Sequence, residues 1–425
     1  MTSHVIGYAG MTHLGLNSAV AAADRGFDVV GFDPDPLLAA ALGRGELPVT
    51  EPDLPGLLQK NAHRIRFTAK PDDLTACDVV YIAPDVPTDD DGRSDLSGID
   101  ALISKVDAVL RPDAVMVILS QVPPGYTRAR LRAGRLLHYQ VETLIFGRAM
   151  ERARRPERLI VGCAEPAQPL PAALAHFLGS FGCPILPMRY ESAELAKISI
   201  NMCLVASIGV ANTMAELCER TGADWSEIVP ALKLDKRIGQ YAYLAPGLGI
   251  AGGNLERDLA TVLALAQRHE TDAGIVAAWV ANSRHRKNWT WSMLDKLVLA
   301  QNPGARVAVL GLAYKEDTHS TKNSPSLALL AHLRDRSVVV YDPVVTPTDA
   351  GIPFKAASSA LEAVQDADVI CIMTPWGEFK QLSPSDLVQR VRGRCVIDPY
   401  RVMDGKAARA AGLRHVTLGV APEKI

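Results

Sequence analysis

The sequence predicts an α/β protein in which two Rossmann-like parallel-sheet domains are joined by a central helical domain with a long bridging helix. Three observations support this fold class. Short apolar runs alternate with helical patterns in the first half, helical patterns alone occupy residues 192 to about 287, and the alternation returns after residue 304. Apolar runs separated by helices are typical of parallel sheets covered on both faces. We therefore expect three domains, over residues 1–190, 191–295 and 296–425.

The first domain is predicted from apolar runs that each lead into a helical pattern. The run 4–9 is followed by a helical pattern over 14–25 and then by the run 28–33, which together predict a β-α-β unit. The strands predicted for this domain are 4–9, 28–33, 78–83, 114–119 and 159–162.

The rest of the chain is predicted as long helices followed by a second sheet. Helical patterns cover 194–221 and 256–291, and a long helix of this kind can offer a face to a partner subunit. The two α/β halves suggest one fold used twice, and not a short-period repeat array. The strands predicted after the helices are 306–311, 337–342, 367–373 and 394–398.

Composition excludes several classes of protein. Of 425 residues 48% are hydrophobic and 22% are charged, which permits large cores and argues against disorder. A net charge of -2 gives no field to attract nucleic acid or an anionic membrane. We find no signal-peptide pattern and no run of 18 apolar residues, and so expect a cytoplasmic protein without a membrane span. The seven cysteines are scattered without a C-x-x-C pair, so we expect reduced thiols and no metal site.

A glycine-rich turn after the first predicted strand indicates a dinucleotide site. The fingerprint G-x-G-x-x-G is present as Gly10-Met11-Thr12-His13-Leu14-Gly15, with threonine in place of the middle glycine. The first glycine makes the tight turn and the third lets helix and strand pack closely, whereas Thr12 should narrow the approach to the pyrophosphate. Asp33 ends the second predicted strand, where a carboxylate binds the ribose hydroxyls and favours NAD over NADP. The alternative is an ordinary β-α-β turn in which Thr12 caps the helix and His13 contacts a phosphate or points to solvent.

Several further segments, in order along nearly the whole chain, resemble the UDP-glucose/GDP-mannose dehydrogenase family. They match that family's stretch after the second strand, its P-T-x-x-D-G…D-L-S, S-T-V-P-x-G, K-x-x-x-N and R-I-G segments, its glycine-rich loop, and three segments of its last domain. In this chain they are residues 45–52, 87–97, 120–125, 197–201, 237–239, 246–253, 311–315, 324–325 and 341–343.

The resemblance implies an architecture and a set of ligands. An N-terminal domain would bind NAD, a central helical domain would form a homodimer, and the last domain would hold the nucleotide of a sugar substrate, with a UDP-sugar expected. Such an enzyme would serve polysaccharide or secondary-metabolite sugar biosynthesis. The cofactor contacts implied, beyond the glycine turn and Asp33, are Pro87, Thr88, Ser120 and Gln121. The substrate contacts implied are Leu144, Arg237, Tyr241, Gly249, Gly252, Lys315 and Lys322.

The family's chemistry also implies catalytic residues. Family members oxidise the sugar C6 alcohol in two hydride transfers, and a cysteine thiolate attacks the intermediate aldehyde. Glu142 matches the glutamate of N-P-E-F, and Lys197 and Asn201 lie four residues apart, on one face of a helix. Lys197 could donate to a C6 oxyanion, and Asn201 could orient a water or the sugar. Asp258 matches the aspartate of F-P-K-D and could pair with Lys197.

The departures from the family pattern cluster near this set. Asn254 stands where the family has its cysteine, and no cysteine lies between residues 219 and 370. An amide cannot form a thiohemiacetal, although Asn254 could instead serve as a helix cap. The other departures are Gln121 for threonine, Val141 for proline, Phe146 for glutamate, and Lys322 for an arginine, which keeps the charge but not the bidentate fork.

Three mechanisms fit these departures, and a fourth interpretation removes catalysis. The enzyme could stop after one oxidation, at an aldehyde or ketone. The aldehyde could hydrate, with Asn254 holding the gem-diol while a second hydride leaves. NAD could take a hydride and return it, which gives net epimerisation. The chain could also be a non-catalytic paralogue that binds NAD or a nucleotide sugar, but the retained acid–base groups Glu142, Lys197 and Asp258 favour the first two mechanisms.

Overall fold

The computed structural model describes residues 4–89 and 93–422, and the chain divides into two compact units, Met1–Ile200 and Asn201–Ile425. The division falls inside one helix, α7 (Tyr190–Thr221). Unit 2 holds both the expected helical domain and the expected last domain, so the three-domain division stays a prediction.

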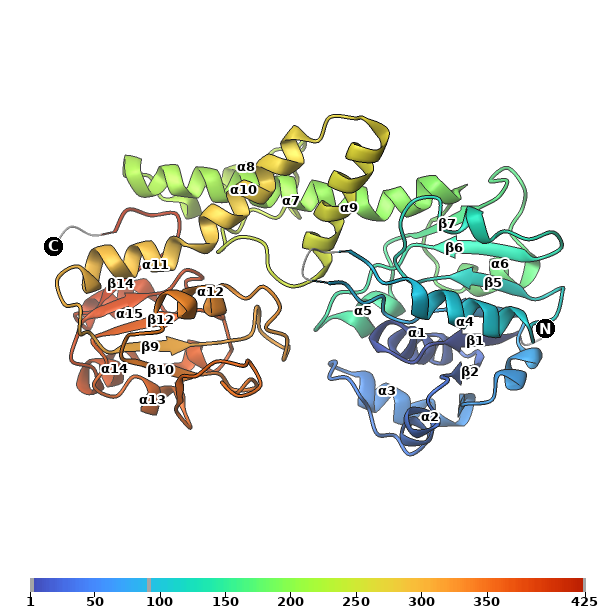
Figure 1. Cartoon of the computed structure of the whole chain (residues 1–425), viewed down its shortest axis with the longest axis horizontal. Coiled ribbons are helices and arrows are strands. Elements are labelled where there is room, and N and C mark those ends of the chain that lie inside the picture. Colours follow the sequence, from blue (N-terminus) through green and yellow to red (C-terminus); the bar gives the residue numbers. More distant parts are fainter. Residues whose placement is uncertain (1–3, 90–92, 423–425) are drawn as a thin grey trace. The chain divides into compact units, whose positions relative to one another are not determined.

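Unit 1 is built on an eight-stranded sheet with the order β3-β2-β1-β4-β5-β6-β7-β8 (Figure 1). All neighbouring strands are parallel except β6 and β7, which pair antiparallel. The five expected strands are confirmed, and the sequence analysis missed β3, β6 and β8. The strands are β1 (Val5–Ala9), β2 (Asp28–Phe32), β3 (Ile65–Thr68), β4 (Val79–Ile82), β5 (Val115–Ile118), β6 (Leu136–Gln140), β7 (Leu159–Cys163) and β8 (Ile185–Arg189).

Helices cover both faces of this sheet, as the continuous apolar strands require. In β4, Val79 and Tyr81 pack with α1 and α6, whereas Val80 and Ile82 pack with α4, in the two-residue alternation of a strand. The helices are α1 (His13–Asp24), α2 (Pro36–Gly43), α3 (Leu54–Lys60), α4 (Ser97–Asp107), α5 (Ala149–Arg154) and α6 (Ala172–Gly179), with short 3-10 turns η1 (Ala62–Arg64), η2 (Pro71–Ala76) and η3 (Arg128–Arg130).

The region after α7 is helical, as expected, but the stretch predicted over 256–291 is three helices. Glu270 ends the first of them with a left-handed φ of 54°, and the carboxylate of Asp272 accepts from the amide of Gly274 at the start of the next, at 3.0 Å. The elements are α8 (Trp225–Leu234), α9 (Asn254–His269), α10 (Gly274–Lys287), α11 (Trp289–Leu294) and a π-helical turn η4 (Asp295–Leu299).

Helix α7 alone, among the described residues, is long and apolar enough to span a membrane by length and composition. Length and composition alone do not establish a span, so the expectation of a protein without a membrane span stays a prediction. Core helices of soluble proteins meet the same criterion, but only 33% of the apolar window of α7 is buried. The helix thus exposes an apolar face within this single chain.

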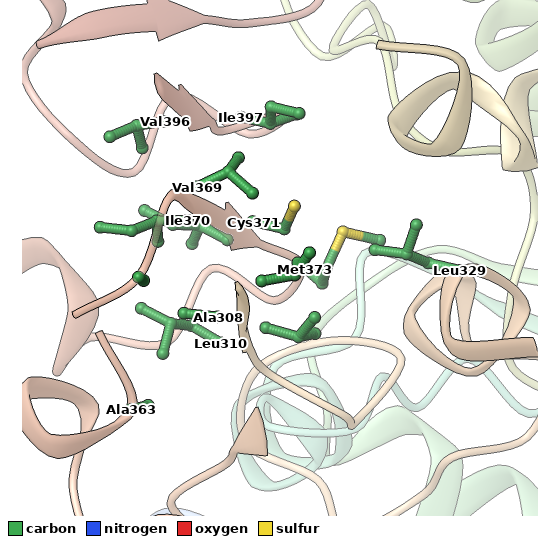
Figure 2. Packing of buried hydrophobic residues seen from close by; sticks show 14 of the residues in the cluster. Ala308, Leu310, Leu329, Ala363, Val369, Ile370, Cys371, Met373, Val396 and Ile397 are labelled. Atoms are coloured by element: carbon green, nitrogen blue, oxygen red, sulfur yellow. The ribbon is translucent and has the colours of Figure 1, made fainter. Parts of the chain in front are cut away.

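The second sheet has the order β11-β10-β9-β12-β13-β14 and is parallel throughout. Figure 2 shows its core, in which Ala308 and Leu310 of β9 lie beside Ile370 and Cys371 of β12. The four expected strands are confirmed, and β11 and β14 are additional. The elements are β9 (Val307–Leu310), α12 (Pro325–His332), β10 (Val338–Tyr341), β11 (Lys355–Ala356), α13 (Ala360–Ala363), β12 (Val369–Ile372), η5 (Phe379–Gln381), α14 (Pro384–Arg390), β13 (Cys395–Ile397), α15 (Gly405–Ala410) and β14 (Arg414–Val416).

The tryptophans are confined to unit 2, where they pack and hydrogen-bond internally. The indole of Trp289 donates to Glu219 at 2.9 Å, and that of Trp225 donates to the carbonyl of Leu244 at 2.8 Å. The five tryptophans of the chain are Trp225, Trp279, Trp289, Trp291 and Trp376.

Candidate functional site

The glycine turn after β1 has the geometry that the fingerprint predicts. Gly10 has a φ of +92° and its amide donates to the carbonyl of Phe32 at the end of β2, at 2.9 Å. A Cβ on Gly15 would lie 1.8 Å from the carbonyl oxygen of Gly10, so only glycine lets α1 approach the turn this closely. The turn therefore holds the N-terminus of α1 against the carboxyl end of the sheet, where parallel α/β folds bind their ligands.

The side chain of Thr12 connects the glycine turn to the segment that follows β4 by hydrogen bonds. It is the N-cap residue of α1 but makes no side-chain cap hydrogen bond. Its hydroxyl instead accepts from the amide of Asp85 at 2.8 Å and donates to the carbonyl of Ala83 at 3.4 Å. The interpretation of Thr12 as a helix cap is therefore wrong.

His13 is buried, so the interpretation that it points to solvent is also wrong. Its Nε2 lies 2.7 Å from Glu51, and its ring stacks on Phe146 with 4.1 Å between centroids. Glu51 also accepts from the amide of Gly147 at 2.8 Å. Glu51 thereby fixes the start of α1 to the loop that contains Phe146, one of the departures from the family pattern.

Asp33 retains acceptor capacity that its counterpart in the second sheet lacks. Asp33 is buried and accepts from the amide of Met11 at 2.7 Å and that of Asp35 at 3.0 Å. Asp342, at the end of β10, accepts five hydrogen bonds, from Leu312, Ala313, Val344, Val345 and the indole of Trp376. A carboxylate has about four acceptor sites, so Asp33 can still bind a ribose diol, whereas Asp342 is saturated by protein donors.

The other predicted cofactor contacts lie in the segments that follow β4 and β5. Ser120, which follows β5 and precedes Gln121, donates to the carbonyl of Pro84 at 2.5 Å. The carbonyl of Pro87 accepts from Asp95 at 2.9 Å, and Thr88 forms an isolated bridge with Ser94. Residues 90–92 of this predicted segment lie outside the described residues.

The loop after Ser120 is anchored by a buried carboxylate that the sequence analysis missed. Glu194 of α7 accepts from the amides of Gly125 at 2.6 Å and Thr127 at 2.8 Å. Desolvation raises the pKa of Glu194 above its usual range, against the lowering effect of these hydrogen bonds. Its position in a helical pattern gave no signal of this role.

Glu142 and Lys197 form an ion pair in unit 1. Lys197 Nζ lies 2.8 Å from Glu142 Oε1, and the side chains are only 12% and 15% exposed. The other carboxylate oxygen of Glu142 accepts from the amide of Leu144 at 2.9 Å. Two residues that would be solvated surface groups in isolation are therefore a fixed acid–base pair.

Asn201 and Asp258 form a second polar pair, in unit 2. Asn201 donates from Nδ2 to Asp258 Oδ2 at 2.5 Å, and Arg257 Nε lies 3.4 Å from Asp258 Oδ1. The expected pairing of Asp258 with Lys197 stays a prediction. Asn254 is the first residue of α9, one turn before Asp258, and the N-cap is Gly253 without a side-chain cap bond. The interpretation of Asn254 as a helix cap is therefore wrong.

The glycine-rich loop before α9 packs closely against two other segments, at Ser283 and at Tyr314. Gly249 and Gly252 have φ values of +79° and +82°, and a Cβ on them would meet the carbonyl of Ser283 at 2.4 Å and the ring of Tyr314 at 2.9 Å. The amide of Gly252 donates to the carbonyl of Lys322 at 3.0 Å. This places Asn254 close to the Lys322 segment of the last domain.

Among the remaining predicted substrate contacts, Arg237 and Tyr241 are exposed. Arg237 pairs with Asp235 at 2.6 Å and its side chain is 89% exposed, and Tyr241 is 85% exposed. Lys315 lies 5.8 Å from the ring centre of Tyr314. No group of three or more His, Cys, Asp or Glu that could hold a metal occurs within 4–89 and 93–422.

Comparison with known proteins decides the family. Models of the NAD-binding, central and UDP-binding domains of the UDP-glucose/GDP-mannose dehydrogenase family match residues 4–173, 191–284 and 308–405. The UDP-glucose 6-dehydrogenase of Pseudomonas aeruginosa is 32% identical over 90% of this chain and 89% of its own. This chain belongs to the UDP-glucose/GDP-mannose dehydrogenase family.

Other members of this family share its length and fold. The UDP-glucose 6-dehydrogenase of Rhizobium meliloti is 30% identical over 96% of this chain and 98% of its own. Among solved structures, a UDP-glucose dehydrogenase from Pyrobaculum islandicum superposes with a TM-score of 0.84 at 25% identity, covering 99% of this chain and 98% of its own. NAD is the cofactor of the family's N-terminal domain, and the close glycine turn and the spare acceptors of Asp33 fit it.

Four of the seven cysteines are buried. Cys77, Cys163, Cys218 and Cys371 are buried, and burial raises the pKa of the Cys77 thiol to about 12. Cys203 is the exposed thiol, on α7. The four buried thiols are shielded from solvent.

Proposed function

We propose that this protein is an NAD-dependent oxidoreductase that oxidises an alcohol of a UDP-sugar without a cysteine nucleophile. The observation that carries the proposal is that this chain keeps two polar couples, Glu142–Lys197 and Asn201–Asp258, and has an asparagine at the family's cysteine position. Such groups supply the proton transfer and oxyanion stabilisation that alcohol oxidation needs.

We assign each residue a role from its partners. Bound NAD supplies the hydride acceptor, held by the glycine turn and by Asp33. Lys197 donates to the oxygen of the reacting alcohol as charge develops, and Glu142, at 2.8 Å, holds the ammonium in place. Asp258 binds Nδ2 of Asn201, so the amide oxygen of Asn201 is oriented to hold a water that takes the hydroxyl proton as the hydride leaves.

Asn254 limits what can follow the first oxidation. Its amide cannot form the thiohemiacetal on which a second oxidation ordinarily depends. We propose either that the reaction stops at the carbonyl product or that the hydrated aldehyde loses the second hydride while Asn254 hydrogen-bonds the diol.

The test is NADH formation against UDP-, GDP-, ADP- and TDP-sugars, with products identified by mass spectrometry. One NADH per sugar with an aldehyde or ketone supports the single oxidation, and two NADH with a carboxylate support the gem-diol route. An isomer without net NADH would show epimerisation. Binding of both ligands without any product would show a non-catalytic paralogue. Lys197→Met should lower turnover about 10²- to 10⁴-fold, while the exposed Lys233→Met on α8 is the charge-matched control.

We further propose a cytoplasmic homodimer in which a second copy covers the apolar face of α7. Val210, Met214 and Leu217 are exposed and lie at i, i+4 and i+7, on one side of the helix. We expect a dimer by light scattering, a monomer for Met214→Glu, and the protein in the soluble fraction of cells. Recovery in the membrane fraction would instead mean that a lipid bilayer covers this face.

A further inference from the structure

The connection between β5 and β6 leaves part of the first sheet without a covering helix. These two strands are parallel, and parallel neighbours are usually joined through an α-helix that packs on the sheet. The described connection, residues 119–135, instead contains one 3-10 turn, η3. A cavity of about 420 Å³ lies there, between α4, this connection and the two strands. Because a cavity of about 150 Å³ already admits benzene, this one can hold a small organic molecule.

The floor of the cavity is apolar. It is formed by Met116 and Ile118 of β5 and by Leu137 of β6, which are at most 5% exposed. Apolar side chains that border a cavity lack contact partners on that side, so an apolar group placed there gains dispersion contacts and removes apolar surface from water. The floor therefore favours a ligand with an apolar body.

The rim of the cavity is charged and has an excess of cations. It carries three arginines and two aspartates, which gives a net side-chain charge of +1, and these are Arg130, Arg132, Arg135, Asp100 and Asp107. Arg135 donates to Asp107 at 2.7 Å and to three backbone carbonyls. Arg130 donates to Asp100 at 2.7 Å. Each aspartate is thus compensated by an arginine, and the excess positive charge belongs to the remaining arginine.

That remaining arginine, Arg132, is open to a ligand. It donates from Nη1 to Asp107 Oδ2 at 2.8 Å, and its side chain is 71% exposed. A guanidinium has five N–H donors in a planar fork that matches the oxygens of a carboxylate or a phosphate. Donors of Arg132 other than the one bound to Asp107 can therefore receive an anion at the mouth of the cavity.

We propose that the cavity between α4, η3, β5 and β6 is a binding site for a small amphipathic anion. The carboxylate or phosphate of the ligand binds Arg132, and its apolar body lies on the floor formed by Met116, Ile118 and Leu137. The described residues that line the cavity are not among the predicted cofactor or substrate contacts. The site is therefore separate from those proposed for NAD and the UDP-sugar, and it does not depend on the proposed activity.

The test is titration calorimetry of phenyl phosphate and of benzoate with the full chain in excess NAD and UDP. We expect one molecule to bind per chain, and phenol and inorganic phosphate, which each lack one half of the ligand, to bind more weakly. Arg132→Met should weaken binding about 5- to 30-fold, the lower part of the range for a charge-assisted hydrogen bond, because solvent screens this side chain. The charge-matched control is Arg334→Met, an exposed arginine of unit 2, which should bind as the wild type does.

A second variant tests the cavity itself. Ala129 lines the cavity and is exposed, so Ala129→Trp can fill the space without crowding the core. It should abolish binding of both phenyl phosphate and benzoate. The proposal would be overturned by no binding of either compound, by binding that occurs only without NAD and UDP, or by binding that Ala129→Trp leaves unchanged. Equal weakening by Arg132→Met and Arg334→Met would overturn the assignment of the anion to Arg132.

Discussion

Breaking the Glu142–Lys197 pair should cost both stability and turnover. At 2.8 Å, the gross attraction in a partly buried site of effective dielectric near 20 is about 6 kcal/mol, much of which desolvation offsets. Lys197→Met removes the cation beside the Glu142 carboxylate, which keeps the amide of Leu144 as a donor at 2.9 Å. Because the side chains are 12% and 15% exposed, we expect a loss of about 2–3 kcal/mol, slightly less than for a fully buried pair.

A double-mutant cycle isolates the pair. We expect Glu142→Gln to cost about 1–2 kcal/mol and the double variant to cost less than the sum, with a coupling of about 1–2 kcal/mol. Thermal unfolding monitored by far-UV circular dichroism should show that Lys197→Met lowers the melting temperature by roughly 5–10 °C for a unit of this size. Turnover should fall about 10²- to 10⁴-fold in both single variants, with a smaller change in KM.

The outcome that refutes this reasoning is specific. Additive effects on stability would mean that the two charges are independently solvated. Full coupling in stability with unchanged turnover would mean that the pair is structural only, and Lys197 would lose its proposed role in stabilising the alkoxide.

Three further predictions concern single positions. Gly15→Ala places a Cβ 1.8 Å from the Gly10 carbonyl oxygen, so we expect the free energy of unfolding to fall by about 3 kcal/mol and NAD binding to be lost. The control is Gly56→Ala, which has open space around it and should not destabilise the protein. Equal melting temperatures of the two variants would contradict this prediction. The pKa of Asp24 is lowered because hydrogen bonds from Lys60, Asn61 and Arg154 outweigh desolvation. Its contribution to stability is therefore present above its unfolded pKa and lost as pH falls, so Asp24→Asn should lower the melting temperature at pH 7 by a few degrees, for about 1 kcal/mol, but not in acid; a difference that persists in acid argues for packing instead. Asn254→Cys should yield or increase the carboxylate product and create inactivation by iodoacetamide, and an unchanged product ratio would show that position 254 does not contact the aldehyde.

The part of the site that depends on residues adjacent in sequence could be predicted from the sequence. The conformations of Gly10 and Gly15 and the place of Asp33 follow from a strand, a tight turn and a helix adjacent in sequence, and each was found as expected. The strands that were missed are polar or interrupted: β3 reads Ile-Arg-Phe-Thr, and β8 carries Pro187, which an edge strand tolerates.

The contacts that redefine the site join residues distant in sequence. Asp85 lies 73 positions from Thr12 and Glu194 lies 69 from Gly125. No periodicity or motif encodes such pairs, because they depend on how strands pair in the sheet. The capping roles predicted for Thr12 and Asn254 were also wrong, because a side-chain cap depends on the direction of the side chain and not on residue type alone.

The confinement of all five tryptophans to unit 2 gives the chain a built-in spectroscopic label. Indole fluorescence will report the unfolding of unit 2 and be silent for unit 1, whose eight strands are visible only to tyrosine emission and backbone signals. Coincident transitions by the two probes would show that the units unfold as one cooperative system, and separate transitions would show that they do not. NAD can then serve as a probe of coupling between the units. Because NAD binds unit 1, it should raise the temperature of the tryptophan-detected transition only to the extent that the two units are thermodynamically coupled.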